Sequence, residues 1–261
     1  MGFLDFLSGL HHPPDYVFEP MFLGEFWEFF NLCVWVILVT YCYKVYGKWI
    51  TVKIFAIGMI YGMVLENGGP LMIPELGFQG YFWEETYHIY LFEFFGYGFR
   101  LSKVPLTTHL GWTNVFFMGY VFYEKIAYAF PSIREGKVKS VVVGFLLISM
   151  SGWMRDLQLD PVATRYRWWT WNQNLLPLWF GVPLVNYIAW FWAVGVFGGA
   201  WVFITNRTAA LSWQATPTDP TSLEKTRAKW LFCALPLIWI IDTVGVMASV
   251  QFFNLCGLIY A

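Results

Sequence analysis

Long apolar blocks separated by short polar connections make up most of this chain. Six windows are mostly apolar over lengths that approach or reach the roughly 20 residues a helix needs to cross a bilayer. They are residues 29–43, 52–65, 104–123, 138–154, 185–204 and 230–250. The pattern predicts an all-α polytopic integral membrane protein with six transmembrane helices.

A seventh apolar window, residues 81–99, carries Glu84, Glu85, His88 and Glu93. Charged groups at the middle of a bilayer are costly, so this window crosses only if those side chains face protein. With six crossings, 11 basic residues share one side and 5 the other; with seven crossings the split is 8 to 8. Because cytoplasmic loops carry an excess of Lys and Arg, six crossings are favoured, with residues 67–103 as an acidic re-entrant or interfacial segment. Seven crossings remain the alternative.

The N-terminal residues predict a surface segment rather than a span. Residues 1–21 contain no Lys or Arg, unlike a secretion signal. Five apolar residues at helical spacing suggest an amphipathic helix on the membrane surface: Phe3, Leu4, Phe6, Leu7 and Leu10. We expect an interfacial segment at residues 1–28 and a single transmembrane domain at residues 29–261. The expected location is a prokaryotic cytoplasmic (inner) membrane.

Composition supports a membrane protein and argues against a nucleic-acid partner. Hydrophobic residues make up 58% of the chain, aromatic residues 22% and charged residues only 13%, about half the charge of an ordinary soluble domain. The net charge is −1, without a basic tract, so nucleic acid is not an expected partner. The four cysteines lie in apolar stretches without metal-site spacing, and we interpret them as packing residues.

The residues most indicative of chemistry lie between positions 154 and 190. Asp156 and Asp160 are four apart, which places both carboxyls on one helix face if the helix extends that far. Pro161 is expected to end that helix. The simplest interpretation is a helix end capped by acids and followed by an interfacial belt of tryptophans.

The order of motifs in this region resembles a known family, the membrane carotenoid hydratases, which include gamma-carotene hydratase and bisanhydrobacterioruberin hydratase. The similarity covers about residues 66–190, and one departure is Arg155, where family members often have tryptophan. The residues that carry the resemblance are Glu66-Asn67-Gly68-Gly69, Val104-Pro105-Leu106, Gly111-Trp112, Asp156, Leu159-Asp160-Pro161, Trp169 with Trp171, Gly181-Val182-Pro183-Leu184, and Asn186-Tyr187 with Trp190.

The resemblance implies that the chain is a hydro-lyase that adds water to a terminal double bond of an acyclic carotenoid, giving a tertiary alcohol. Such a reaction needs a proton donor and a base that positions water. Two carboxyls in different environments can divide those roles. Asp156 and Asp160, with Glu66 as a third member, are the expected catalytic residues. Aromatic faces can stabilise the cation by roughly 1–2 kcal/mol each when desolvated.

The expected substrate-binding residues are Trp112, Trp169, Trp171, Asn186, Tyr187 and Trp190. The expected partners are a carotenoid or another isoprenoid lipid and membrane lipids. No cofactor is expected, because the reaction involves no oxidation or reduction.

Two other functions are compatible with the sequence. The chain could be a non-catalytic pigment- or lipid-binding subunit of a larger membrane complex, with its aromatic surface making the contacts to other subunits. A metal site at Glu84, Glu85 and His88 is a weaker alternative, because di-iron proteins use the Glu-x-x-His pattern twice and only one copy is present. Asp242, alone in the last window, is expected to face protein or a cavity.

Overall fold

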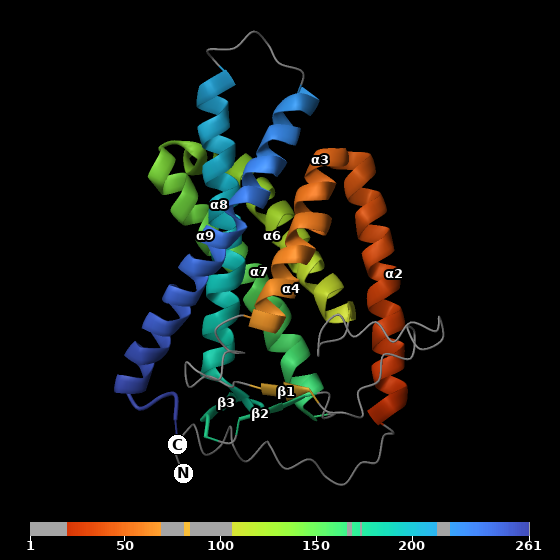
Figure 1. Cartoon of the computed structure of the whole chain (residues 1–261), viewed down its shortest axis with the longest axis vertical. Coiled ribbons are helices and arrows are strands. Elements are labelled where there is room, and N and C mark those ends of the chain that lie inside the picture. Colours follow the sequence, from red (N-terminus) through yellow and green to blue (C-terminus); the bar gives the residue numbers. More distant parts are fainter. Residues whose placement is uncertain are drawn as a thin grey trace.

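In the part of the chain that the computed structural model describes, six long helical segments form a bundle aligned with the long axis of the molecule (Figure 1). The structure describes residues 20–68, 81–83, 106–165, 169–172, 174–212 and 220–260. The helices are α2 (Pro20–Tyr46), α3 (Lys48–Thr51), the π-helix η1 (Val52–Ile57), α4 (Gly58–Gly68), α6 (Leu106–Ala129), the 3-10 turn η4 (Pro131–Arg134), α7 (Lys137–Arg165), α8 (Leu184–Ser212) and α9 (Pro220–Leu255).

Five of the six apolar windows lie wholly within these segments, with α3, η1 and α4 forming one continuous helix. The window 104–123 lies in α6 from residue 106 onward, and its first two residues lie outside the described part of the chain. Five helical stretches are long and apolar enough to cross a membrane: Phe29–Tyr46, Lys48–Glu66, Lys137–Thr164, Leu184–Thr208 and Thr221–Leu255. The sixth helix, α6, is 24 residues long but carries the polar residues His109, Thr113 and Asn114, all of them buried. These features are those of a helical membrane protein. The number of crossings stays a prediction.

Four short strands lie at one end of the bundle (Figure 1). Strand β1 (Tyr81–Trp83) pairs antiparallel with β2 (Trp169–Trp171), and β3 (Pro177–Trp179) pairs with β4 (Val182–Pro183). A seventh helix beginning at residue 81 is therefore not formed, because the backbone there pairs with β2. The remainder of that window, including Glu84, Glu85 and His88, lies outside the described residues, as do residues 1–19 of the predicted interfacial segment.

The prediction that Pro161 ends its helix is wrong. Helix α7 continues to Arg165 with Pro161 inside it. Proline removes only one backbone N–H and its ring disturbs only the preceding turn. Only four residues follow Pro161 in α7, so few backbone hydrogen bonds of this helix lie beyond the proline. The continuation keeps Asp160 within the helix, on the same face as Asp156.

Helices α7 and α8 make the most extensive contact in the bundle, through glycines. A Cβ added at Gly195 would lie 2.2 Å from the Ser149 Oγ, and one at Gly198 would lie 2.7 Å from three side-chain carbons of Ile148. The Ser149 hydroxyl also donates to the backbone oxygen of Phe191 across the interface. Small residues bring membrane helices close in this way, and the close approach fixes the relative positions of the residues described below.

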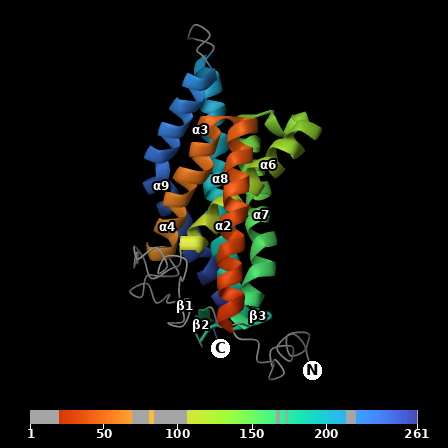
Figure 2. The same cartoon turned by 90° about the vertical axis from the view of Figure 1, so that its right-hand side faces the viewer.

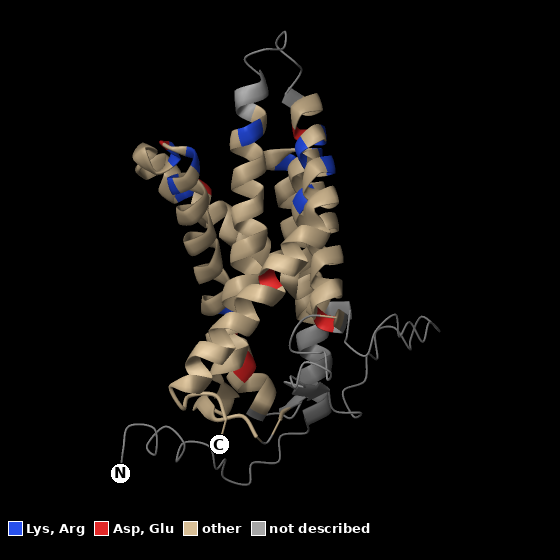
Figure 3. Cartoon of the chain, turned by 60° about the vertical axis from the view of Figure 1, so that its left-hand side comes forward, with Lys and Arg blue, Asp and Glu red and all other residues tan. Residues whose placement is uncertain are grey.

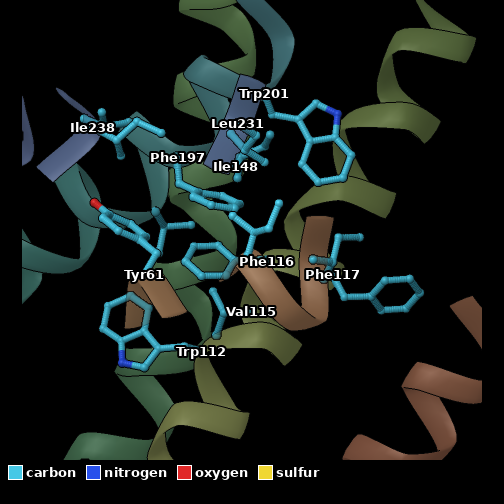
Figure 4. Close-up of a cluster of buried hydrophobic side chains, with 14 of the residues drawn as sticks. Tyr61, Trp112, Val115, Phe116, Phe117, Ile148, Phe197, Trp201, Leu231 and Ile238 are labelled. Atoms are coloured by element: carbon cyan, nitrogen blue, oxygen red, sulfur yellow. The ribbon is translucent and has the colours of Figure 1, made fainter. Parts of the chain in front are cut away.

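Aromatic rings fill the centre of the bundle between α4, α6 and α8. Phe116 stacks on Phe197 with ring centroids 4.3 Å apart, and Tyr61 stacks on Phe197 at 5.5 Å. Figure 4 shows these three rings side by side, with Trp112 at one end of the cluster and Trp201 at the other. Helix α2 stands at the right-hand side of the bundle in Figure 1 and in front of the other helices in Figure 2, so it lies on the outside of the bundle.

Most of the basic side chains of the described residues gather at the end of the bundle opposite the strands (Figure 3). Lys53, on η1, is buried there and forms a 2.7 Å ion pair with Glu224 of α9. Its ammonium group also lies 4.0 Å from the centroid of the Trp201 ring. Arg227 makes a second ion pair with Glu224. The two ends of the bundle thus differ in charge, as the distribution of Lys and Arg in the sequence predicts.

Candidate active site: a buried carboxyl pair

Asp156 and Asp160 form a buried carboxyl pair near the C-terminal end of α7, at the end of the bundle where the strands lie. Their side chains follow one another by one helical turn, which places them on the same face. Asp156 is 0% exposed and Asp160 is 3% exposed. Buried carboxyls need hydrogen-bond partners or neutralisation, so their partners determine what the pair can do.

Asn186 holds both carboxyls. Its side-chain amide nitrogen donates to Oδ2 of Asp156 at 2.7 Å and to Oδ2 of Asp160 at 2.6 Å. A side-chain amide has two N–H groups, so these two bonds use its full donor capacity. Asn186 lies in the first turn of α8, directly after β4. The close packing of α7 on α8 therefore places this amide between the two acids.

Two further charged groups act on the pair. Arg155, partly buried on α7, exerts its positive charge on both carboxyls, and Glu66 exerts its charge on Asp160. Glu66 is buried near the end of α4. Glu66, which the sequence groups with the two aspartates, therefore lies within electrostatic range of Asp160. Three carboxyls and one guanidinium thus share one electrostatic environment.

A tryptophan stack adjoins Glu66. The Trp112 indole of α6 donates to Oε1 of Glu66 at 2.7 Å. The same ring lies parallel to Trp190 of α8, with centroids 4.0 Å apart and an interplanar angle of 12°. Four helices therefore contribute to the site: α4, α6, α7 and α8. The stack thus lies next to the Glu66 carboxyl.

Tyr187 and Trp153 complete the described surroundings of the pair. Tyr187 is buried, and its hydroxyl lies within electrostatic range of both aspartates. Trp153 donates from its indole to the backbone oxygen of Tyr187 at 2.7 Å, joining α7 to the start of α8. Trp153 and Arg155 were not among the predicted site residues. The available signal in the sequence was their spacing in the same helix: Trp153 lies three residues before Asp156, and Arg155 lies one residue before it.

Strand β2 carries two of the predicted substrate-binding residues, Trp169 and Trp171. The Trp171 indole donates to the hydroxyl of Thr164 at 2.9 Å, which ties β2 to the last turn of α7. The backbone of Trp169 lies in β2, opposite Trp83, but its side chain lies outside the described part of the chain. A binding role for these two residues stays a prediction.

Asp242, on α9, is a further buried acid, and its position agrees with the expectation that it faces protein. It is 1% exposed on α9, and its charge acts on the hydroxyl of Tyr61. Among the described residues, Oδ1 of Asp242 and the Tyr61 hydroxyl have no hydrogen-bond partner. No group of three or more His, Cys, Asp or Glu residues in the described part of the chain is arranged to hold a metal ion. The predicted alternative at Glu84, Glu85 and His88 lies outside that part.

The fold and the site together define a helical membrane protein with a buried carboxyl pair inside its bundle. A family model described as carotenoid biosynthesis protein matches residues 26–255, and the chain belongs to that family. Comparison with curated proteins gave no match, and neither did comparison with solved structures. Family membership supports a carotenoid-modifying membrane protein, with carotenoids or related isoprenoid lipids as its substrate class.

Proposed function

We propose that the protein adds water to a terminal carbon–carbon double bond of an acyclic carotenoid end group, giving a tertiary alcohol. The observation that carries this proposal is the buried pair of Asp156 and Asp160 held by one amide. A polar group of this kind, inside an apolar bundle that receives an apolar substrate, is suited to proton transfer rather than to structural packing alone.

The pair is suited to work with one proton. Two adjacent buried carboxyls do not both ionise readily, because their negative charges repel each other in a region of low dielectric. One carboxyl then serves as the acid and its neighbour as the base. The positive charge of Arg155 and the two N–H bonds from Asn186 stabilise the single negative charge that remains. Glu66 is proposed as the third acidic member of the set.

The reaction proceeds by protonation of the less substituted alkene carbon. The carboxylic acid gives up its proton, the double bond opens, and a tertiary cation forms at the neighbouring carbon. Water then adds to the cation, and the carboxylate takes the surplus proton, which restores the starting state of the pair. No electron is gained or lost overall, so the proposed reaction requires no redox cofactor.

The Trp112 and Trp190 stack is proposed to form the wall beside the reacting carbons. The face of a tryptophan ring attracts a cation by roughly 2 kcal/mol when water is excluded. Because Trp112 also donates to Glu66, the position of this wall is coupled to the acidic set. An aromatic wall also suits the flat, conjugated body of a carotenoid.

The test is to express the chain in a host engineered to accumulate lycopene and related acyclic carotenoids, and to analyse extracted pigments by liquid chromatography and mass spectrometry. A new pigment heavier by one water, absent when Asp160→Asn is expressed to the same level, supports the proposal. Unchanged pigments with folded protein in the membrane contradict it. If pigment then co-purifies unaltered with the chain, the non-catalytic pigment-binding alternative is favoured instead.

A further inference from the structure

Two polar atoms beside the carboxyl pair remain unsatisfied. Oδ1 of Asp156 and the hydroxyl of Tyr187 are both inaccessible to solvent and have no hydrogen-bond partner among the described residues. The other oxygen of Asp156, Oδ2, accepts from Asn186. The carboxyl oxygen that can still accept a hydrogen bond is therefore Oδ1, which Asn186 does not contact.

Tyr187 lies in the contact between α7 and α8 that also contains the carboxyl pair. Tyr187 follows Asn186 directly in the first turns of α8, where that helix packs on α7. Trp153, one turn before Asp156, donates to the Tyr187 backbone oxygen and holds this stretch of α8 against α7. The hydroxyl lies within electrostatic range of both Asp156 and Asp160.

Buried polar atoms without a protein partner are costly, and in proteins they commonly share an ordered water. A water held at a polar site usually makes two to four hydrogen bonds. Here a carboxyl oxygen can accept from a water, and a phenolic hydroxyl can donate to it or accept from it. The two atoms thus have the complementary chemistry that a bound water requires.

We propose that Oδ1 of Asp156 and the Tyr187 hydroxyl hold the water that adds to the substrate. This assignment rests on the proposed hydration. It gives the protonation of the alkene and the addition of water to different residues. Asp160 delivers the proton to the alkene carbon. Tyr187 orients the water oxygen toward the tertiary cation, and Asp156 accepts the proton that this water loses as the carbon–oxygen bond forms. Proton exchange between the two adjacent carboxyls returns the pair to its starting state.

The assignment predicts an unusual defect when the hydroxyl alone is removed. Tyr187→Phe keeps the ring and the acid, so the cation still forms. Without an oriented water the cation instead loses a proton and returns to alkene. In heavy water the added proton is a deuteron, so the recovered, unhydrated carotenoid gains deuterium at the terminal double bond.

The experiment incubates purified protein with an acyclic carotenoid in heavy water and measures both hydration rate and deuterium in recovered substrate by mass spectrometry. For Tyr187→Phe we expect hydration about 10- to 100-fold slower, the size of effect that one hydrogen bond to a charged group accounts for. Recovered substrate is expected to carry several-fold more deuterium than with the unmodified protein. Asp160→Asn is expected to lose both hydration and deuterium uptake.

A matched control is Tyr61→Phe. It removes another buried hydroxyl that has no hydrogen-bond partner among the described residues. The acid within electrostatic range of this hydroxyl is Asp242, not the carboxyl pair. It is expected to change neither readout. Hydration by Tyr187→Phe at the unmodified rate overturns the water assignment and leaves the proposed function intact. Loss of both hydration and deuterium uptake in Tyr187→Phe also overturns it, because the hydroxyl would then be needed for protonation or folding. Absence of hydration by the unmodified protein overturns the proposed function itself.

Discussion

The Trp112 indole donates a 2.7 Å hydrogen bond to the buried carboxyl of Glu66, which joins α6 to the end of α4. Trp112→Phe removes this donor but keeps an aromatic ring against Trp190. A buried acceptor that loses its partner costs about 1–3 kcal/mol. We therefore expect the free energy of unfolding in detergent to fall by about that amount.

The matched control for this prediction is Trp190→Phe, which shortens the other ring of the stack and leaves the bond to Glu66 intact. It is expected to be less destabilising than Trp112→Phe in the same denaturant titration. Equal destabilisation by the two substitutions would show that ring volume, and not the hydrogen bond, accounts for the effect.

We expect hydration to require both Asp156 and Asp160 but not Asp242, another buried aspartate. Asp156→Asn and Asp160→Asn keep the shape of each side chain and remove its acid–base function. Because general acid–base catalysis contributes about 100-fold or more, each variant is expected to lose at least that much hydration rate. Pigment analysis after matched expression measures the loss.

Asp242→Asn makes the identical change at another buried aspartate within the bundle. Hydration by this variant is expected to stay within a few-fold of the unmodified protein. If all three variants lost activity equally, the loss would reflect folding rather than the chemistry of the pair.

Close packing of α7 and α8 predicts a sharp difference between two adjacent glycines. A Cβ at Gly198 would lie 2.7 Å from Ile148 side-chain carbons, whereas one at Gly199 would lie 3.5 Å from the Phe145 Cβ, an ordinary contact distance. Overpacking a fitted interface costs about 1–3 kcal/mol. Gly198→Ala is therefore expected to lower the thermal unfolding midpoint and the hydration rate, and Gly199→Ala to leave both nearly unchanged.

The two glycine substitutions differ only in position, so helix propensity affects both alike. A similar unfolding midpoint for Gly198→Ala and Gly199→Ala would contradict the proposed close approach of the helices.

The ion pair at the basic end of the bundle predicts a stability effect without a direct effect on chemistry. Glu224→Gln leaves the buried Lys53 without its anionic partner. Loss of a charged hydrogen bond costs about 2 kcal/mol, so we expect destabilisation of that order. Glu124→Gln removes a partner of Arg134 in an exposed pair, where the expected effect is below about 1 kcal/mol. Chemical denaturation of both variants checks the order, and a larger effect for Glu124→Gln would contradict it.

Hydrophobic patterning predicted the six helices, and the spacing of Asp156 and Asp160 predicted a shared face. Those features depend on neighbours in the sequence. The Asn186 bridge depends on the rotation of α8 against α7, which small residues such as Gly195 and Gly198 set through contacts distant in sequence. Periodicity alone does not encode that rotation.

The same limitation explains the other differences. Strand β1 forms only because β2 lies beside it, more than 80 residues along the chain. Helix α7 passes Pro161 although a local rule predicts an end there. Trp153 had no motif of its own, and its contact with the backbone of Tyr187 becomes evident only when α7 and α8 are packed together.

Hydration by the buried carboxyl pair is tested most directly by the origin of the product oxygen. Purified protein is incubated with an acyclic carotenoid in water enriched in heavy oxygen, with and without dissolved dioxygen, and the product is examined by mass spectrometry. The account predicts a tertiary alcohol that carries the heavy oxygen, forms equally without dioxygen, and is absent with Asp160→Asn. A product whose oxygen comes from dioxygen, or no oxygenated product from folded protein, would contradict it.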